Sequence, residues 1–476
     1  MQRHWILYPL AFASLTGLLA RPAVSQEVRP LVELSRPNAV GNCDTGLKMP
    51  SSGPWPTDEA GEPVVAVNPI HPNNIVAAWM QGHSQDIVAA VTLDGGQTWE
   101  RIPIPLTTCS GGPFLGTGDP WLSFAPNGDL YAVAVIGNSL SKRGIGVSKS
   151  GDGGLHWSAA LLIPESVIVA DHPSLTADPK DARFVYAIWN NLGIAVFSRT
   201  TDGGLTWKPA RTIVQNKVPQ SYIQFSQILV LPNGTLVDIY EFKKYPKTDK
   251  PVVNLQVRRS TNHGRTWSAP RNAVTMTPLL RAGIGFTLVV DPKTGQFVSD
   301  PTNPSFAVDR HNGSLYAVWE DGRFSDFQYP DTAFAMSADG GLTWSVPIRV
   351  NRTPLDIVQA NRQAFLPSIA VAEDGTIGVS YYDFRFNDPN PGLPTDHWLV
   401  LCHPSSARPA TSPANWGSEV RLTDSSFNME VVVPTMVGKF IGDYFGLATA
   451  GDDFVSVFTQ PDHDNVNTIF VRRIKP

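Results

Sequence analysis

The 476-residue sequence lacks several features that would assign it to other classes of protein. Only 17% of its residues are charged, its net charge is −5 and it has no basic cluster, so nucleic acids and anionic membranes are not expected as partners. Its ten histidines are scattered, without the H-x-H or H-E-x-x-H spacings of zinc enzymes, which argues against a transition-metal catalytic site. Hydrophobic residues still make up 42% of the chain, which is ample material for a globular core.

Hydrophobic runs long enough to span a membrane are missing as well. An apolar stretch over residues 5–20 follows a short basic start at Arg3 and precedes the small residues Ala23-Val24-Ser25. This order is typical of a secretory signal and its cleavage point. We therefore expect residues 1–25 to be a signal peptide and residues 26–476 to be a single exported domain, extracellular or periplasmic.

Cysteine is scarce, and its number is odd. The chain has Cys43, Cys109 and Cys402, so at least one cysteine must stay unpaired within the chain. A disulfide between Cys43 and Cys109 would tie the N-terminal segment to the first long loop. The sequence alone leaves this pairing open.

What the sequence does contain is a short motif, [S/T]-x-D-G-G-x-[T/H]-W, in four clear copies and one degraded copy. The Asp side chain can accept hydrogen bonds from the backbone amides that follow it, and Gly-Gly supplies the positive φ angles of a tight turn. The Trp offers a large apolar face that can seal one structural unit against the next. The aspartates and tryptophans concerned are Asp94 and Trp99, Asp152 and Trp157, Asp202 and Trp207, Asp339 and Trp344, with Trp267 in the degraded copy.

This motif resembles the Asp-box, or BNR, repeat of the sialidase superfamily of β-propellers. The resemblance implies an all-β fold in which each such turn joins the two outer strands of a four-stranded antiparallel blade, on the face away from the active site. We therefore expect the repeated aspartates to be structural, because function has to be argued from a site rather than from a fold.

A second repeat gives the number of blades. A residue followed by Pro and then an apolar strand recurs along the chain, as in Glu62-Pro63 and Leu366-Pro367, and Pro at the first residue of a strand costs no ladder hydrogen bond. Counting these strand starts predicts seven blades, with six, as in familiar sialidases, as the alternative. The last unit, from about residue 444 to 476, has room for three strands only. The segment near residues 28–34 is expected to supply the fourth strand and close the ring.

The strand starts and the loops after each second strand would gather many polar side chains on one axial face. Insertions at 241–254, 276–302 and 385–398 would wall this face and shape a pocket. The resemblance to sialidases implies arginines that bind a carboxylate, a proton donor, and a Tyr nucleophile activated by a Glu. The candidates are Arg281, Arg323 and Arg385, with Arg362 as a substitute, for the arginines; Tyr382 or Tyr444 for the nucleophile; Glu241 or Glu320 for its partner; Asp119 or Asp171 for the acid; and His172, Asp383 and Asp443 for further substrate contacts.

Structural interpretations compete with these roles. Asp321-Gly322-Arg323 and Asp383-Phe384-Arg385 can be turns in which the Asp caps the loop and pairs with the Arg, and Asp119 can simply cap a strand. No cofactor is required, although a ring of acids at the axis could hold a structural calcium ion. Its members would be Glu62, Asp119, Asp171 and Asp443.

The function predicted from these residues is that of a secreted, monomeric, carbohydrate-active propeller that acts on a glycan or polysaccharide, most simply an exo-sialidase-like glycoside hydrolase. The first strand reads Glu62-Pro63-Val64, without the Arg of the Arg-Ile-Pro type motif that sialidases carry there, and Arg101-Ile102-Pro103 follows the first Asp box instead. Two alternatives therefore stay open. One is a non-catalytic propeller that binds glycan or protein, and the other is a polysaccharide lyase.

Overall fold

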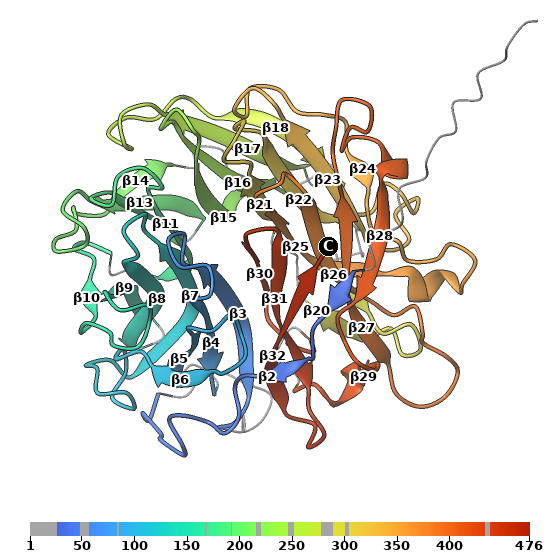
Figure 1. The fold of residues 1–476 in the computed structure, drawn as a ribbon, viewed down its shortest axis with the longest axis horizontal. Coiled ribbons are helices and arrows are strands. Elements are labelled where there is room, and N and C mark those ends of the chain that lie inside the picture. Colours follow the sequence, from blue (N-terminus) through green and yellow to red (C-terminus); the bar gives the residue numbers. More distant parts are fainter. Residues whose placement is uncertain are drawn as a thin grey trace, which may run out of the picture.

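Seven β-sheets stand around a central axis in the computed structural model (Figure 1). The structure describes residues 26–47, 57–82, 85–139, 141–166, 169–191, 193–215, 220–245, 252–277, 289–299, 304–433 and 438–476. Each sheet is an antiparallel blade whose strands follow one another from the axis outward. The predicted all-β propeller with seven blades is confirmed, and the six-bladed alternative is wrong.

The first four blades consist of four consecutive strands each. They are β3 (Ala60–Val67), β4 (Ile75–Gln81), β5 (Asp86–Thr92) and β6 (Glu100–Pro103); β7 (Gly116–Phe124), β8 (Leu130–Ser139), β9 (Lys142–Ser150) and β10 (Leu161–Leu162); β11 (Ala170–Ala177), β12 (Val185–Asn191), β13 (Ile194–Thr200) and β14 (Arg211–Val214); and β15 (Ser221–Val230), β16 (Leu236–Lys244), β17 (Val252–Ser260) and β18 (Arg271–Met276).

A short hairpin and three further blades follow. The hairpin is β19 (Val289–Val290) and β20 (Phe297–Ser299). The blades are β21 (Ser305–Val308), β22 (Leu315–Asp321), β23 (Asp331–Ser337) and β24 (Ile348–Arg349); β25 (Ala364–Val371), β26 (Ile377–Asp383), β27 (Pro394–Cys402) and β28 (Trp416–Arg421), with β29 (Phe427–Asn428) also on β27; and β30 (Gly446–Ala450), β31 (Asp453–Pro461) and β32 (Asn467–Lys475). Three short 3-10 helices are η1 (Gln359–Arg362), η2 (Pro413–Asn415) and η3 (Met429–Val431).

Strands in the middle of a blade are buried on both faces, because each blade lies between two others. All seven residues of β4 are buried, as are all seven of β12 and of β22. This explains why these segments have nearly continuous apolar sequences rather than an alternating pattern. Neighbouring innermost strands are joined by side chains: the Ser174 hydroxyl donates to the Ser226 carbonyl at 2.8 Å, and the Ser368 hydroxyl donates to the Phe445 carbonyl at 3.0 Å.

The prolines of the second repeat do not stand at the first residue of the innermost strands, so that expectation is wrong. Strand β3 begins at Ala60, and Pro63 lies inside it, where the pairing register shifts between Gly61 and Val64. Pro120 lies at the same kind of irregularity in β7. Proline has no N–H to donate, and a β-bulge is a place within a strand where that donor is not required.

The repeated Asp-Gly-Gly turns join the third and fourth strands of a blade, as predicted. Asp94 Oδ1 accepts hydrogen bonds from the backbone N–H groups of Gln97 at 2.9 Å and Thr98 at 3.0 Å, and Oδ2 accepts one from the Thr98 hydroxyl at 2.6 Å. Because the bonds from Thr98 favour the charged form, they lower the pKa of Asp94. The degraded copy keeps this geometry, since Asn262 Oδ1 accepts from the Thr266 N–H at 2.9 Å.

Each turn packs against the preceding blade. A Cβ atom added to Gly154, whose φ is +103°, would lie 3.0 Å from side-chain atoms of Val76 and Val91 in the first blade, so glycine fits best there. Trp157 of the same turn packs against the hydrophobic cluster that the first and second blades share. The tryptophan therefore seals one blade against the next, as predicted.

Removing one of these turn carboxylates should destabilise the protein without affecting its activity. Asp202 accepts hydrogen bonds from the Thr206 N–H at 3.0 Å and the Thr206 hydroxyl at 2.5 Å. Asp202→Ala should lower the free energy of unfolding by about 1 kcal/mol, as for the loss of other side-chain caps. Thermal unfolding and specific activity per folded molecule would be measured together. A loss of specific activity at unchanged melting temperature would contradict the structural role.

The N-terminal segment completes the seventh blade, as predicted. Strands β1 (Glu27–Val28) and β2 (Val32–Glu33) both pair antiparallel with β32, on the side away from the axis (Figure 1). Leu34 is fully buried beside them, and the Ile469 N–H donates to Ser35 Oγ at 2.9 Å. The chain therefore closes the ring by hydrogen bonds between its two ends.

The cysteines also take defined places. Cys43 and Cys109 form a disulfide that joins the N-terminal segment to the loop after the first blade. Cys402 is free and buried. The pairing that the sequence left open is therefore between Cys43 and Cys109.

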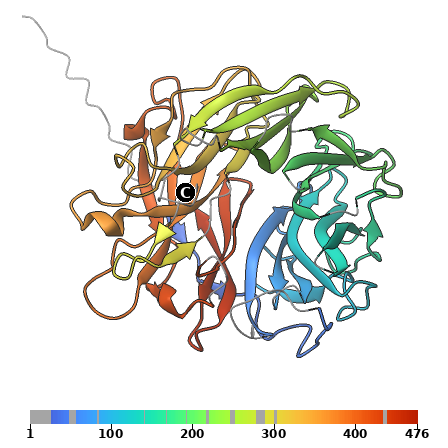
Figure 2. The ribbon, with the colours of Figure 1, turned by 180° about the vertical axis from the view of Figure 1, so that it is seen from behind.

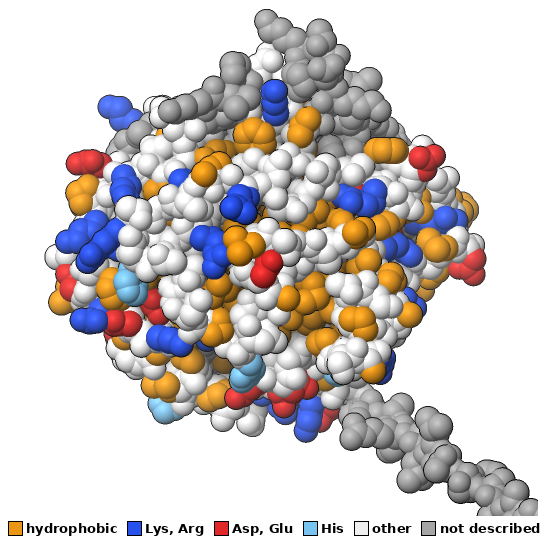
Figure 3. All heavy atoms as spheres, turned by 90° about the horizontal axis from the view of Figure 1, so that it is seen from above, with side chains coloured by type: hydrophobic (Ala, Val, Ile, Leu, Met, Phe, Trp, Pro, Cys, Tyr) orange, Lys and Arg blue, Asp and Glu red, His pale blue; other side chains and the backbone are white. Residues whose placement is uncertain are grey.

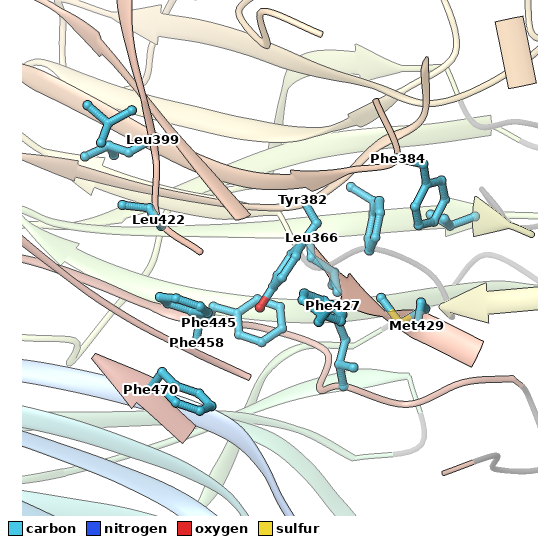
Figure 4. Close-up of a cluster of buried hydrophobic side chains, with 14 of the residues drawn as sticks. Leu366, Tyr382, Phe384, Leu399, Leu422, Phe427, Met429, Phe445, Phe458 and Phe470 are labelled. Carbon is cyan, nitrogen blue, oxygen red and sulfur yellow. The ribbon is translucent and has the colours of Figure 1, made fainter. Parts of the chain in front are cut away.

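The largest hydrophobic cluster lies between the sixth and seventh blades and encloses a histidine. Figure 4 shows Tyr382 among the aromatic and aliphatic side chains of this cluster. The ring of His397 lies 4.2 Å from that of Tyr382 and 4.6 Å from that of Phe458, measured between centroids. Both nitrogens of His397 are buried without a hydrogen-bond partner among the described residues, and burial lowers its pKa from 6.5 to about 3.

His397 should make the stability of the protein depend on pH. Between pH 6.5 and about 3 the unfolded chain binds a proton at this histidine and the folded chain does not. The free energy of unfolding should therefore fall as the pH is lowered through this window. His397→Phe should reduce that fall, as measured by urea unfolding at a series of pH values. An unchanged slope in the variant would rule out His397 as its source.

The distribution of charge on the surface agrees with the low charge and the lack of a basic cluster in the sequence. On the side of the propeller shown in Figure 3, lysines, arginines, aspartates and glutamates are interspersed among polar and hydrophobic side chains. Within the described residues, no helix is long and apolar enough to cross a membrane.

Candidate active site

The innermost strands all begin at one end of the axis, which we refer to as the strand-start face. The Asp-Gly-Gly turns lie at the opposite end. Gly95 donates its N–H to the carbonyl of Asn73, in the turn where β3 leaves the axis, and Gly203 donates to Arg183 in the equivalent turn after β11. The repeated turns and the starts of the inner strands therefore occupy opposite ends of the propeller.

Five inner strands carry the same strained bulge near the strand-start face. The φ angles of the bulge residues are 55° at Glu62, 52° at Asp119, 45° at His172, 58° at Phe225 and 51° at Leu366. Residues with a Cβ rarely adopt this left-handed conformation. Each such residue costs on the order of 1–3 kcal/mol, and strain of this kind is concentrated at functional sites. Its repetition around the axis marks the strand-start face as the candidate site.

Acids of the preceding blade hold two of these bulges. The His172 N–H donates to Asp119 Oδ2 at 2.9 Å, and the Leu366 N–H donates to Glu320 Oε1 at 2.7 Å. Glu320 is buried, which raises its pKa well above the ordinary value. Asp119 and Glu320 therefore both have a structural contact to the next blade, in addition to any chemical role.

Four carboxyl groups come together on the first three blades and the loop before β30. Asp119 lies within hydrogen-bonding reach of both Glu62 and Asp171, and Asp443 is close enough to interact electrostatically with Glu62. Burial, followed by the neighbouring carboxyls of Asp119 and Asp443, raises the pKa of Glu62 well above its usual range. Partial burial and the Asp119 carboxyl raise the pKa of Asp171, although His172 and Arg143 oppose the rise.

Two cationic groups accompany these acids. His172 Nε2 lies 3.7 Å from Asp171 Oδ2. Burial lowers the pKa of His172, but the carboxyls of Asp171 and Asp119 outweigh it, so the net shift is upward. Arg143, at the start of β9, is the cation whose charge acts on Asp171 from the second blade. Carboxyl groups and cations thus lie close together on the strand-start face.

A cavity of about 150 Å³ runs along the axis beside this cluster. His172, Trp121, Phe225 and Tyr444 line it, together with small polar and apolar residues of the inner strands. The ring of Trp121 lies 6.0 Å from that of Tyr444, and His172 contacts Phe225 edge-on at 4.7 Å. An aromatic cavity with charged groups beside it is a common form of ligand site.

Tyr444 lies where the acids meet the cavity. Its hydroxyl donates to the Pro120 carbonyl at 3.2 Å and also interacts with the Glu62 carboxyl. Burial, followed by the charges of Glu62 and Asp119, raises the pKa of Tyr444 well above 10. The carboxyl beside Tyr444 is therefore that of Glu62, and not that of Glu241 or Glu320.

Glu241 is held in a buried ion pair on the fourth blade. Lys243 Nζ lies 2.8 Å from Glu241 Oε2 and donates to Gln224 Oε1 at 3.1 Å. Lys243 also lies over the ring of Phe225, 5.7 Å from its centroid, and its charge acts on His172. Lys243 was not among the residues singled out from the sequence. The sequence did contain a sign of it, because Lys243 stands two residues after Glu241 in a mostly apolar strand, so that both side chains project from the same face.

Two of the arginines predicted to bind a carboxylate, Arg323 and Arg385, are held by carboxyl groups of the protein. Arg323 makes paired hydrogen bonds to Asp321, with Nε–Oδ1 at 2.8 Å and Nη2–Oδ2 at 2.8 Å. Arg362 donates to the Ile357 carbonyl, and Arg281 lies outside the described residues. The turn interpretation of Asp321-Gly322-Arg323 thus describes the observed contacts.

Arg385 is held more firmly still. It donates to Asp383 Oδ2 at 2.8 Å and to Glu419 Oε2 at 2.7 Å, and its guanidinium stacks on Trp398, 3.6 Å from the ring centroid. Tyr382, on the same blade, is fully buried and its hydroxyl donates to the Thr459 carbonyl at 2.7 Å. Of the predicted site residues, the structure therefore brings together Asp119, Asp171, His172, Asp443 and Tyr444, and it places Arg323, Arg385, Asp383 and Tyr382 in separate contacts of the fifth and sixth blades.

The described part of the insertion at 276–302 is the β19–β20 hairpin, which lies in front of the last two blades in Figure 2. Val289 and Val298 pack with Phe365 and Phe445 in the largest hydrophobic cluster. Gln363 fixes the hairpin, because its side chain both accepts from the Val290 N–H and donates to the Val290 carbonyl. The insertion therefore covers the sixth and seventh blades, whereas most of the acids lie on the first three.

The geometry does not support the calcium site expected from the sequence. In the part of the chain that the structure describes, one group of three metal-binding side chains has ligand atoms within 4.8 Å of one another: Asp462, His463 and Asp464. Arg36 forms ion pairs with both of these aspartates. The four acids at the axis, Glu62, Asp119, Asp171 and Asp443, do not form such a group.

No protein-family model matches the sequence, and no curated protein sequence matches it either. Solved structures resemble the chain in fold. An α-L-arabinanase of Penicillium chrysogenum complexed with arabinobiose is 15% identical, over 85% of this chain and 99% of its own, with a TM-score of 0.47. A Hadza microbial sialidase is 17% identical, over 84% of this chain and 74% of its own, with a TM-score of 0.45.

A third such structure is the GH93 α-L-arabinofuranosidase of Fusarium graminearum in complex with arabinobiose. It is 11% identical, over 94% of this chain and 98% of its own, with a TM-score of 0.43. These enzymes are sialidase-like β-propellers, the fold that the repeats predicted. The likeness is one of overall fold, and it assigns no reaction to this chain.

Proposed function

We propose that this protein is a secreted glycoside hydrolase, with Asp171 as the proton donor and Asp119 as its carboxylate partner. The observation that supports this proposal most directly is the contact between these two carboxyls beside an axial cavity lined by aromatic rings. A glycoside hydrolase needs a carboxyl group that carries a proton for the leaving group, and a second carboxyl in contact with it helps to keep that proton in place.

The electrostatics of the pair favour such a division of roles. Two carboxyls in contact resist simultaneous ionisation, which raises the pKa of one of them. Asp171 has a raised pKa and a side chain that is 43% exposed, so it can hold a proton and also reach a substrate. Asp119 accepts a hydrogen bond from the backbone N–H of His172 at 2.9 Å, so the following blade holds its carboxyl in place next to Asp171.

The surrounding groups would position the sugar. Trp121, Phe225 and Tyr444 line the cavity, and sugar rings have apolar faces that pack well against aromatic groups. The strained bulges fix Asp119 and His172 relative to the axis, because a rigid strand rather than a mobile loop carries each of them. A preorganised site of this kind lowers the cost of reaching the transition state.

A sialidase-type reaction is a second candidate, and the contact between Tyr444 and Glu62 favours it. In that reaction a Tyr activated by a Glu would attack the sugar. The raised pKa values of both groups oppose activation in the unliganded protein. Arg323 and Arg385 also have their donors engaged by Asp321, Asp383 and Glu419, so they are poorly placed to bind the carboxylate of an acidic sugar.

The test is a substrate screen on the purified mature chain with sialosides, uronate-containing glycans, and neutral arabino- and gluco-oligosaccharides. Release of a reducing sugar from any of them without an unsaturated product would support a hydrolase. A product with a new carbon–carbon double bond would indicate a lyase instead. Binding without turnover would indicate a non-catalytic propeller, and neither binding nor turnover would contradict a carbohydrate function.

A further inference from the structure

Asn190 stands directly opposite Asp171 at the strand-start end of the third blade. It belongs to β12, and its pairing partner on β11 is Asp171. Residues directly opposite each other on an antiparallel pair project from the same face of the sheet, with Cβ atoms about 4.5–5.5 Å apart. The carboxamide of Asn190 therefore lies beside the proposed proton donor.

This carboxamide is buried but unsatisfied. Asn190 is 3% exposed, and neither its Oδ1 nor its Nδ2 has a hydrogen-bond partner in the described structure. Buried amides are nearly always hydrogen-bonded, because a donor or acceptor removed from water without a partner costs free energy. An amide that lacks partners on both of its atoms, beside a pair of carboxyls, indicates a place where another polar molecule binds.

Arg143 shows the same lack of a partner from the other side of Asp171. Its Nε is buried and unbonded among the residues that the structure describes, while its charge acts on the Asp171 carboxyl. The second and third blades thus place a carboxamide, opposite Asp171 in the strand register, and a guanidinium, which interacts electrostatically with Asp171, near the same carboxyl. The carboxyl offers hydrogen-bond acceptors, the carboxamide offers both a donor and an acceptor, and the guanidinium offers donors.

We propose that Asp171, Asn190 and Arg143 form a subsite for an uncharged sugar residue, and that Asn190 determines this specificity by binding its hydroxyls. A hydroxyl both donates and accepts, so it can satisfy both atoms of the Asn190 carboxamide. The cations beside these groups, Arg143 and His172, already lie close to carboxyls of the protein, so they are poorly placed to bind the carboxylate of an acidic sugar as well. This inference rests on the proposed glycan hydrolysis.

The experiment measures kcat and KM for neutral and acidic oligosaccharides with the mature protein and Asn190→Ala. The variant should raise KM for the best neutral substrate roughly tenfold to a hundredfold, as expected for the loss of one or two hydrogen bonds, and should change kcat less. Its melting temperature should stay the same or rise, because the substitution removes an unsatisfied amide. Asn190→Leu keeps more of the side-chain volume and should have the same effect on KM.

Asn191→Ala is the matched control. Asn191 is the next residue of β12, is equally buried at 4% exposure and also has an unpartnered Oδ1 within the described chain, but it projects from the opposite face. It should leave KM unchanged. If the unmodified protein turns over neutral glycans and Asn190→Ala keeps its KM, the subsite is wrong while the hydrolase stands. Turnover of acidic sugars alone would also overturn the subsite, and no turnover of any glycan would overturn both proposals.

Discussion

Asp171→Asn is expected to lower kcat for glycan hydrolysis by about 10²- to 10⁴-fold, the usual contribution of a general acid. Asparagine keeps the size and much of the hydrogen bonding of the aspartate, but it cannot deliver a proton to the leaving group. The loss should appear in kcat more than in KM, because the proton is transferred in the transition state. Steady-state kinetics on the best substrate of the screen would measure both constants.

The pH dependence of Asp171 gives a second readout. A proton donor must be protonated, so activity should fall as the pH rises through the raised pKa of Asp171. The free energy of unfolding should also fall as the pH rises. The folded chain keeps the proton at pH values where the unfolded chain has lost it, so this carboxyl makes the fold less stable as the pH rises through that window. Asp171→Asn should therefore be at least as stable as the parent at neutral pH.

Asp181→Asn is the control for this experiment. Asp181 lies in the turn at the other end of the same strand pair, where it forms an exposed ion pair with Arg183. Its replacement should leave both kinetic constants unchanged. If Asp171→Asn retains full activity while the parent hydrolyses glycans, then Asp171 is not the proton donor.

Deletion of residues 26–35 should have the largest effect on the fold itself. It removes β1, β2 and Leu34, and it leaves the whole of β32 as an open edge. The Leu34 N–H donates to the Ile469 carbonyl at 2.7 Å, and Arg101 donates to the Leu34 carbonyl at 2.5 Å. Truncating a buried leucine alone typically costs 2–5 kcal/mol, and an exposed strand edge promotes aggregation. The product should be unstable or aggregated in size-exclusion chromatography and thermal unfolding.

A shorter deletion separates the parts of this closure. Removal of residues 26–30 takes away β1 but leaves β2, Leu34 and the ion pair of Arg36 with Asp462. It should reduce stability only modestly. A 26–35 deletion that remains as stable and as free of aggregates as the full mature chain would show that the ring does not depend on this segment.

The features predicted well from the sequence are those set by local chemistry. The Asp-Gly-Gly-x-Thr-Trp turns carry their own hydrogen-bond acceptors and glycines, so their conformation follows from seven or eight consecutive residues. The pairing of Arg323 with Asp321 is equally local, since only Gly322 separates them. The position of the prolines was wrong because a bulge depends on the register of two strands, which the sequence of one strand does not reveal.

The candidate site could be predicted only in part, because its members come from distant segments. Tyr444 meets Glu62 across the closure of the ring, and Asp119 meets Asp171 across a blade boundary. The sequence placed these residues on one face but could not say which of them touch. It also could not show that side-chain atoms of Asn190 and Arg143 are buried without hydrogen-bond partners in the described structure, since that depends on the packing of neighbouring blades.

Closure by the N-terminal segment also sets a condition on synthesis. The hydrogen bond between Ser35 and Ile469 joins residues 434 positions apart, so the N-terminal strands must wait for β32 to be translated before they can pair with it. Contacts of such large sequence separation form late, after a costly loop closure. A nascent chain that stops short of β32 cannot complete the seventh blade, whatever the state of the other six. Synthesis of β32 is thus a condition for ring closure, and translation products that lack it should remain open and sensitive to proteases.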